Sequence, residues 1–176
     1  MKGLFLLNAF IFYEEKVKNH HQVDNASCIY HIGSMDWLPN TQGLDWFLNK
    51  VLPILHNLEK DFVVRLAGKN MTNQFKIKNA QHNLILDGEV NDSLEYHLDK
   101  TIMIVPLLSG GGIRVKIIEA LALGKVVIST SKGAEGILYT NRENIIIADS
   151  PEMFARAIID CLESVELRKS LSLNAR

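Results

Sequence analysis

Short apolar runs alternate with segments of helical periodicity along most of this chain. The runs expected to form strands are residues 29–33, 62–67, 84–86, 101–106, 125–129 and 145–148. Strands that alternate with helices favour parallel pairing through right-handed crossover connections. Residues 101–106 and 125–129 are apolar almost throughout, as expected of central strands that are covered on both faces. The pattern therefore predicts an α/β fold, with a Rossmann-like, doubly wound parallel sheet flanked by helices.

The segments between these runs predict the helices. Residues 41–59 place apolar side chains on one face at helical spacing, namely Leu44, Phe47, Leu48, Val51, Leu55 and Leu58. Pro53 lies within this segment and is expected to kink the helix or to limit its length. Residues 91–93 give a start signal for a helix over 94–100, and residues 113–123 predict another. A further helix is expected to begin at Pro151 and to continue through residues 162–176.

The first residues are predicted to lie apart from a single domain that covers residues 28–176. Residues 3–13 are apolar and resemble the core of a signal peptide. They are shorter than the ~20 residues that span a bilayer, and no small-residue cleavage site follows them. We favour the alternative that they form a strand or helix that packs on another part of a parent protein. Residues 14–27 are polar and without periodicity, which is typical of a tether.

The composition excludes some classes of function. Lys and Arg total 19 against 20 Asp and Glu, which gives a net charge of −1 and no basic field to attract nucleic acid. Cys28 and Cys161 lack metal-type spacing and are expected to be buried free thiols of a protein in the reducing cytoplasm. The six histidines form no metal-binding pattern, so no metal site is predicted. His31 lies within a predicted strand and is expected to be structural.

One segment combines several features of an anion-binding site. Gly110, Gly111 and Gly112 follow a predicted buried strand and precede a predicted helix. Glycines let the backbone approach a ligand closely, and a helix N-terminus adds about half a positive charge. Arg114 and Lys116 would lie in the first turn, where cations oppose the helix dipole unless an anion offsets them. The segment therefore predicts a diphosphate site, although each residue taken singly also fits a loop and a solvated helix face.

Glu119 lies farther along the same predicted helix, where its carboxylate can accept hydrogen bonds from two ribose hydroxyls. Standard phosphate motifs do not match. Neither Gly-Lys pair of the chain is followed by Ser or Thr, and Val115 occupies the third glycine position of the dinucleotide pattern. Trp37 and Trp46 flank the first loop and helix, where each can stack on a sugar or pack against another protein surface.

The longest motif of the chain resembles a known family signature. Residues 105–130 read VPLLSGGGIRVKIIEALALGKVVIST, and the sequence GAEG follows at residues 133–136. Together they resemble the signature of the group 1 (family 4) glycosyltransferases. Residues 33–40, 67–69, 87–90 and 173–176 are similar to the same family, so the resemblance runs from about residue 29 to the last residue. It implies a GT-B fold, in which two Rossmann-like domains face each other across a cleft, with this chain as the C-terminal, donor-binding half.

The resemblance also implies roles for individual residues. The donor diphosphate would be held by Gly110, Gly111, Gly112, Ile113, Arg114 and Lys116, and the ribose by Glu119. The base would be flanked by Gly88, Glu89 and Val90. The cleft would be lined by Gly33, Ser34, Lys69, Ala134, Glu135 and Gly136. The family commonly carries a second glutamate eight positions before Glu119, where this chain has Gly111, so no catalytic residue is assigned.

The implied function is donor binding in a retaining hexosyltransferase of glycan or polysaccharide biosynthesis. The donor would be a UDP- or GDP-linked sugar, with no other cofactor and no metal. An N-terminal acceptor-binding domain and a glycan acceptor would be the partners, so the isolated chain is expected to be inactive. Its exposed cleft face would allow the isolated chain to form a homodimer. The other domain would attach the parent protein peripherally to the inner face of the membrane. The alternatives are a non-catalytic nucleotide-binding or interaction module and a fragment of a sugar-nucleotide epimerase that shares the GT-B fold.

Overall fold

The computed structural model describes residues 27–57, 61–73, 75, 79 and 82–175. The predicted N-terminal segment, residues 1–27, lies outside this part except for Ser27. Cys28 and Cys161 are both buried and free, as predicted.

Six parallel strands form one sheet in the order β3-β2-β1-β4-β5-β6. The strands are β1 (Cys28–Ile32), β2 (Val63–Ala67), β3 (Leu84–Gly88), β4 (Ile102–Val105), β5 (Val126–Ser129) and β6 (Ile146–Ile147). This is the strand order of Rossmann folds. Strands β1 to β3 are added toward one edge of the sheet and β4 to β6 toward the other, so the switch point lies between β1 and β4. Every residue of β4 and β5 is buried, which confirms their prediction as central strands. The predicted fold class is therefore confirmed.

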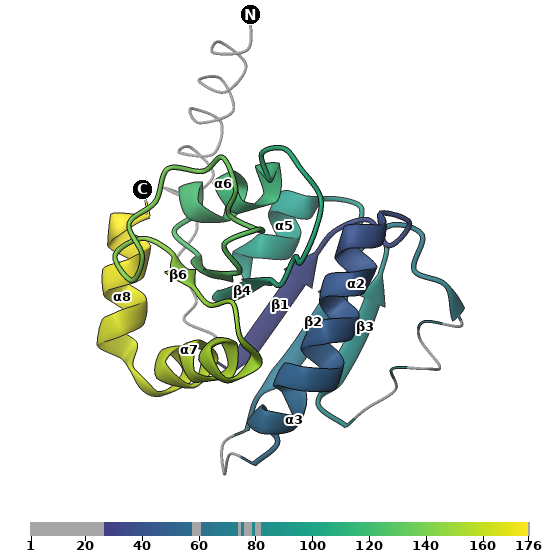
Figure 1. Cartoon of the computed structure of the whole chain (residues 1–176), viewed down its shortest axis with the longest axis horizontal. Coiled ribbons are helices and arrows are strands. Elements are labelled where there is room, and N and C mark those ends of the chain that lie inside the picture. Colours follow the sequence, from purple (N-terminus) through teal and green to yellow (C-terminus); the bar gives the residue numbers. More distant parts are fainter. Residues whose placement is uncertain (1–26, 58–60, 74, 76–78, 80–81, 176) are drawn as a thin grey trace, which may run out of the picture.

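Helices cover both faces of the sheet (Figure 1). One apolar core joins the sheet to α2 (Leu38–Trp46), η1 (Phe47–Val51), α3 (Leu52–Leu55), α7 (Pro151–Glu163) and α8 (Val165–Asn174). The second core joins the opposite face to α5 (Ser93–Leu98) and α6 (Val115–Ala122). Side chains alternate between the two cores along β1, where Ile29 belongs to the first and Tyr30 to the second.

The first helix differs in its bounds from the predicted range of 41–59. It begins at Leu38, because Pro39 lies in the first turn, where a missing N–H costs nothing. The turn before Pro53 widens into the π-helical segment η1, in which the Leu52 N–H donates to the Phe47 carbonyl. An α-helical turn at this place would drive the proline ring into the carbonyl four residues earlier. The kink predicted from Pro53 therefore takes the form of a π-turn, and α3 ends at Leu55.

Two further predictions of helix bounds are corrected. Residues 162–176 do not continue α7, because the chain breaks at Ser164, whose hydroxyl caps the separate helix α8 by accepting from the Leu167 N–H at 3.1 Å. The helix predicted over 113–123 begins only at Val115, because Arg114 has an extended backbone, with φ −87° and ψ 93°. The starts of α5 at the Asp92 cap and of α7 at the Ser150 cap agree with the prediction.

Candidate functional site

The loops that follow β1 to β5 meet at the carboxyl edge of the sheet, and we call residues 33–37, 68–70, 88–90, 106–114 and 130–136 together the rim. Two backbone hydrogen bonds join its first three loops, from Met35 N to Lys69 O at 2.8 Å and from Gly68 N to Gly88 O at 2.7 Å, and a third runs from Gly33 N to Ala67 O at the end of β2, at 3.0 Å. The approach is close, since a Cβ on Gly68 would lie 1.8 Å from the Gly33 carbonyl oxygen. The predicted site residues at positions 33, 69 and 88 therefore belong to adjoining loops.

The glycine loop of the rim depends on two of its three glycines. Gly110 and Gly112 have φ of +92° and +89°, a region that favours glycine. A Cβ on Gly110 would also lie 2.9 Å from the Trp37 ring. Gly111 has no positive φ, and no atom of the other described residues lies within 4 Å of where its Cβ would be. The loop thus holds open space at Gly111, where the family signature commonly has a carboxylate.

Arg114 lies at the end of this loop, directly before α6. Its guanidinium is buried, and Nη1 donates to the carbonyl oxygens of Gly111 at 2.5 Å and Gly112 at 2.6 Å. The guanidinium carbon lies 5.0 Å from the centroid of the Trp37 ring, within the range of a cation–π contact. Its Nε and Nη2 atoms are buried without a hydrogen-bond partner in the described part of the chain. Unsatisfied charged donors are costly in a protein interior, and an anion at this place would remove that cost.

Lys116 lies in the first turn of α6, with a half-buried side chain that contacts β1 and α2. Its Nζ lies 3.0 Å from Asn40 Oδ1 and 3.4 Å from His31 Nε2. Burial lowers the pKa of Lys116 to about 7, and the positive charge of Arg114 contributes to the shift. The sequence predicts a fixed positive charge here, whereas the structure gives an amine that titrates near neutral pH.

His31 is fully buried, and its ring is oriented by the backbone of β4. The Ile104 carbonyl lies 2.9 Å from His31 Nδ1, and a carbonyl only accepts, so Nδ1 carries the proton. Burial, with a further contribution from the Lys116 charge, holds the pKa of His31 well below its usual value. The ring is therefore neutral and presents the Nε2 lone pair to Lys116.

Asn40 completes the contacts of Lys116 from α2. Its Nδ2 donates to the Ser34 carbonyl at 2.8 Å, which turns Oδ1 toward the Lys116 amine. A Cβ on Gly33 would lie 2.7 Å from Asn40 Nδ2 and 2.9 Å from Lys116 Nζ, so only glycine leaves room for this arrangement. Neither His31 nor Asn40 was predicted as a site residue from the sequence. The one signal was a polar residue in an apolar strand, directly before its carboxyl end.

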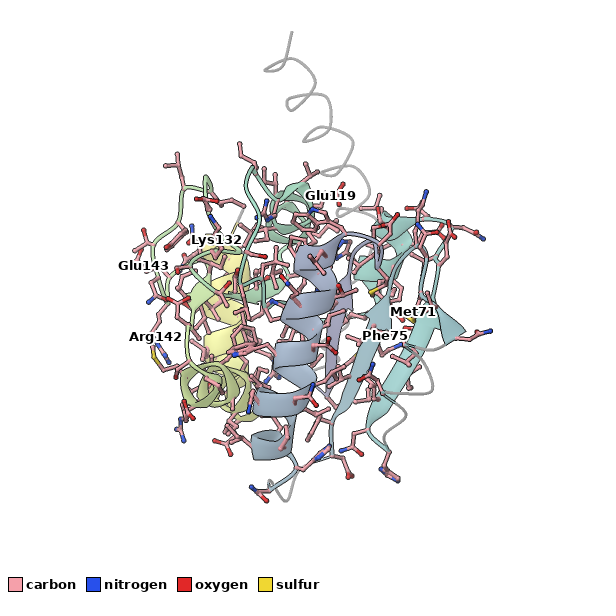
Figure 2. All side chains as sticks on the ribbon, turned by 45° about the vertical axis from the view of Figure 1, so that its right-hand side comes forward. Met71, Phe75, Glu119, Lys132, Arg142 and Glu143 are labelled. Atoms are coloured by element: carbon pink, nitrogen blue, oxygen red, sulfur yellow. The ribbon has the colours of Figure 1, made fainter. Side chains whose placement is uncertain are left out.

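The remaining predicted residues lie at several places around the rim. Glu119 is half-buried on α6, one turn beyond Lys116, and Figure 2 shows it at the end of the molecule where α2 begins. Glu89 is exposed and lies 3.9 Å from Lys69 in a weak ion pair. Val90 is partly buried against the α5–α6 core.

The loop after β5 places three predicted residues in different surroundings. Ala134 is fully buried, so its side chain belongs to the core rather than to an open surface. Glu135 is exposed and pairs with Lys132 at 2.9 Å, and this pairing lowers the pKa of Glu135. Gly136 has φ of +79°, and a Cβ there would lie 3.2 Å from the side chain of Ile113. The glycine loop and the loop after β5 therefore lie side by side at this point.

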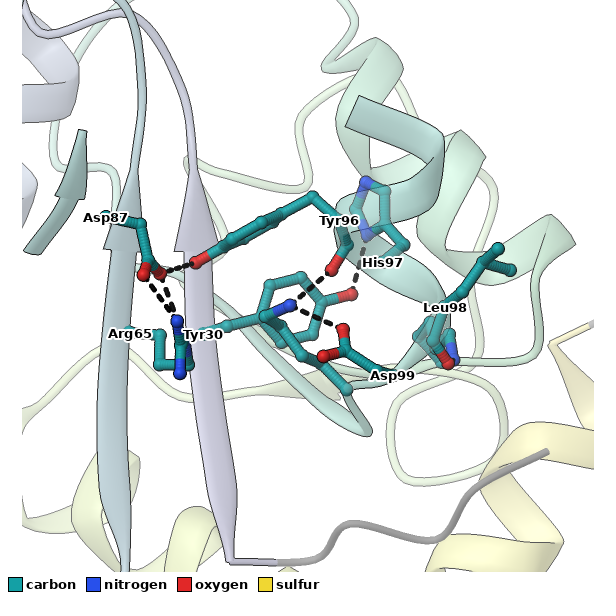
Figure 3. A network of polar contacts seen from close by, with 9 residues as sticks. Tyr30, Arg65, Asp87, Tyr96, His97, Leu98 and Asp99 are labelled. Carbon is teal, nitrogen blue, oxygen red and sulfur yellow. Dashed lines mark hydrogen bonds and ion pairs between the residues drawn. The ribbon is translucent and has the colours of Figure 1, made fainter. Parts of the chain in front are cut away.

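A polar network beneath the rim fixes β3 to α5 (Figure 3). Asp87 accepts hydrogen bonds from Arg65 at 2.5 and 3.0 Å and from the Tyr96 hydroxyl at 2.7 Å. Arg65 on β2 is therefore paired with a carboxylate. Because Asp87 directly precedes Gly88, the network positions the turn over residues 88–90.

Within the described residues, no group of His, Cys, Asp or Glu side chains comes together in a way that could hold a metal ion. None of the described helices is long and apolar enough to cross a membrane.

Comparison with known protein families gives one match that covers most of the chain. The family described as "Glycosyl transferases group 1" matches residues 26–164. The chain is 29% identical, over 166 residues, to an "Uncharacterized 44.6 kDa protein in cps region" of Klebsiella pneumoniae. This match covers 89% of the chain and 42% of that protein, so the chain spans less than half of its curated relative.

Solved structures show the same fold at low sequence identity. The C-terminal domain of the group 1 glycosyl transferase LpcC from Francisella tularensis has a TM-score of 0.69 at 18% identity, over 90% of this chain and 93% of that one. Anabaena HepE in complex with UDP has a TM-score of 0.68 at 13% identity, over 92% of this chain and 44% of that one. The fold is thus one Rossmann-like half of a GT-B glycosyltransferase. Because the family match covers most of its residues, the chain belongs to the group 1 glycosyltransferases.

Proposed function

We propose that this chain is the donor-binding domain of a retaining glycosyltransferase and binds a nucleotide-diphosphate sugar at the rim. UDP and GDP are the proposed nucleotides, and the first has support from the UDP complex of HepE, which shares the fold. The relative encoded in a cps region favours a role in polysaccharide biosynthesis. An N-terminal domain would supply the acceptor site, so the chain alone binds the donor without transferring its sugar.

The observation that carries the proposal is the buried guanidinium of Arg114. Two of its nitrogen atoms have no hydrogen-bond partner among the residues that the structure describes, and the positive end of α6 begins at the next residue. A diphosphate would accept from these nitrogens, and its negative charge would be stabilised by both Arg114 and the helix N-terminus. The same groups would stabilise the diphosphate as it leaves the sugar, so a metal ion is not required in this proposal.

The other proposed contacts follow from the position of each residue around the rim. Glu119 lies one turn farther along α6 than Lys116, where its carboxylate would accept from the ribose hydroxyls. The turn over residues 88–90 would flank the base. At Gly111 the loop offers backbone rather than a carboxylate, so the sugar contacts would come from other parts of the complete protein.

The test is thermal unfolding of the chain with UDP, GDP and ADP, in the presence and absence of EDTA. At one hundred times Kd, ligand binding adds about 2.7 kcal/mol to stability. For a domain of this size the midpoint should rise by about 5–11 °C with the correct nucleotide. EDTA should leave this rise unchanged.

Two arginine variants separate a specific site from a general effect. Arg114→Met should abolish the rise, because it removes the proposed diphosphate ligand. Arg168→Met is a matched control, since Arg114 and Arg168 are both 6% exposed and Arg168 likewise donates to a backbone carbonyl, that of Cys161. It should retain the rise. A folded wild-type chain whose midpoint none of the nucleotides raises would contradict donor binding and favour the interaction module.

A further inference from the structure

Two flat groups from different loops face each other at the rim. Trp37 is the last residue before α2, and Arg114 is the last residue before α6. The guanidinium carbon of Arg114 lies over the Trp37 ring, 5.0 Å from its centroid. Arg114 is buried, and Trp37 is half-buried against the second core. A cation over a ring face is stabilised more strongly where water is excluded, so the Trp37 ring provides one wall for the guanidinium.

The Trp37 ring is itself held in place from two sides. Its backbone belongs to the start of α2, because the Trp37 carbonyl accepts from the Asn40 N–H at 2.9 Å. The glycine loop packs directly on the ring, since a Cβ on Gly110 would lie 2.9 Å from ring carbon Cζ2 and 3.1 Å from the Pro39 ring. The ring therefore lies fixed between the start of α2 and the loop that carries Arg114.

The hydrogen bonds of Arg114 leave one edge of its guanidinium without a partner. Nη1 donates to the carbonyl oxygens of Gly111 and Gly112, which fixes the group within its own plane. The Trp37 ring fixes the plane itself. Nε and Nη2, which share one edge of the group, have no hydrogen-bond partner in the described part of the chain. Such an edge donates two parallel hydrogen bonds to the oxygens of one phosphate, provided that its orientation is held.

We propose that Trp37 is a positioning residue for Arg114, whose guanidinium it holds so that Nε and Nη2 donate together to one phosphate of the donor. The inference rests on the proposed donor site and assigns Trp37 a role in it. Trp46 has different surroundings, because it packs against Phe154 in the first core, with ring centroids 5.5 Å apart and planes at 87°. The two tryptophans can therefore be compared as a test residue and its control.

The first measurement is calorimetric titration with UDP, with GDP in its place if UDP does not bind. Trp37→Met keeps an apolar side chain but removes the ring face, so the affinity should fall by roughly 10-fold. Trp37→Phe carries a ring face and should recover most of the affinity. Trp46→Met is the matched control, since Trp46 is also half-buried, and it should bind UDP as the wild-type chain does.

The position of the guanidinium can also be followed without a ligand, which separates positioning from a general structural role. In the free wild-type chain, the ring current of Trp37 should displace the NMR signal of the Arg114 Nε–H from the ordinary arginine position. Trp37→Met should return the signal to that position, Trp37→Phe should keep part of the displacement, and Trp46→Met should leave it unchanged. A purely structural role of Trp37 would lower the stability of its variants without moving this signal.

Fluorescence covers the case in which Trp37→Met does not fold. The chain has two tryptophans, so Trp46→Phe leaves Trp37 as the only one. The nucleotide should shift the emission of this variant, because it pairs the charge that lies over the ring.

Three results would overturn the inference and leave the proposed function intact. They are an Arg114 signal that is the same in the wild-type chain and Trp37→Met, an affinity of Trp37→Met equal to that of the wild-type chain, and Trp37 emission that stays unchanged at saturating nucleotide. A folded wild-type chain that binds neither nucleotide would overturn both the inference and the proposed function.

Discussion

At the scale of single residues, the sequence identified the cations of the rim but not their surroundings. The glycine run and Arg114 are visible because they are adjacent in sequence. His31 and Asn40 are not, because Lys116 contacts them across 85 and 76 positions. The backbone carbonyl that orients His31 lies 73 positions away. A histidine in an apolar strand therefore suggested a structural role until the fold placed it beside a lysine.

The three consecutive glycines should respond differently to alanine. Gly110→Ala and Gly112→Ala should each destabilise the chain by about 1–2 kcal/mol, because both have positive φ. Gly111→Ala should be neutral or stabilise by up to about 1 kcal/mol, since its backbone and surroundings accept a side chain. Urea unfolding measures all three. Equal effects at the three positions would contradict the loop conformation described here.

At the scale of elements, the sequence predicted the kinds of helices and strands better than their ends. Apolar periodicity is local, and it identified each described strand and the helices around them. The ends of the elements depend on which of several neighbouring residues caps the helix or forms the turn. Arg114 was assigned to α6 but has an extended backbone, and Ser164 splits the last predicted helix in two. The shift at Arg114 matters for the proposed diphosphate site, because it places the guanidinium in the loop rather than on the helix.

At the scale of the whole molecule, the alternation of strands and helices predicted a doubly wound parallel sheet through right-handed crossovers, whereas the order of its strands came from the structure. The sequence could not predict which polar groups the two cores would enclose. His31 and His97 are both fully buried against the sheet. Burial, with contributions from Lys125, Lys100 and Lys116, lowers the pKa of His97 to about 3.

These histidines should make the fold sensitive to acid. Each is neutral in the folded chain and charges in the unfolded chain below a pKa of about 6.5, so stability is full above that pH and is lost as the pH falls. His97 alone should cost roughly 2 kcal/mol between pH 7 and 5. Urea unfolding at the two pH values measures the loss, and His97→Asn should reduce it. His82→Gln, a change at an exposed histidine, should leave it unchanged. Equal stability of the wild-type chain at both pH values would contradict the buried neutral state.

The most direct test of donor binding at the rim is an NMR titration of the 15N-labelled chain with UDP, following backbone amides and arginine Nε–H signals together. Binding as proposed should shift the Arg114 Nε–H signal and the amides of residues 110–112, because they would contact the diphosphate. The Arg168 Nε–H signal, on α8, should stay in place. Shifts confined to other surfaces, with the Arg114 signal unchanged at saturating UDP, would contradict the diphosphate site.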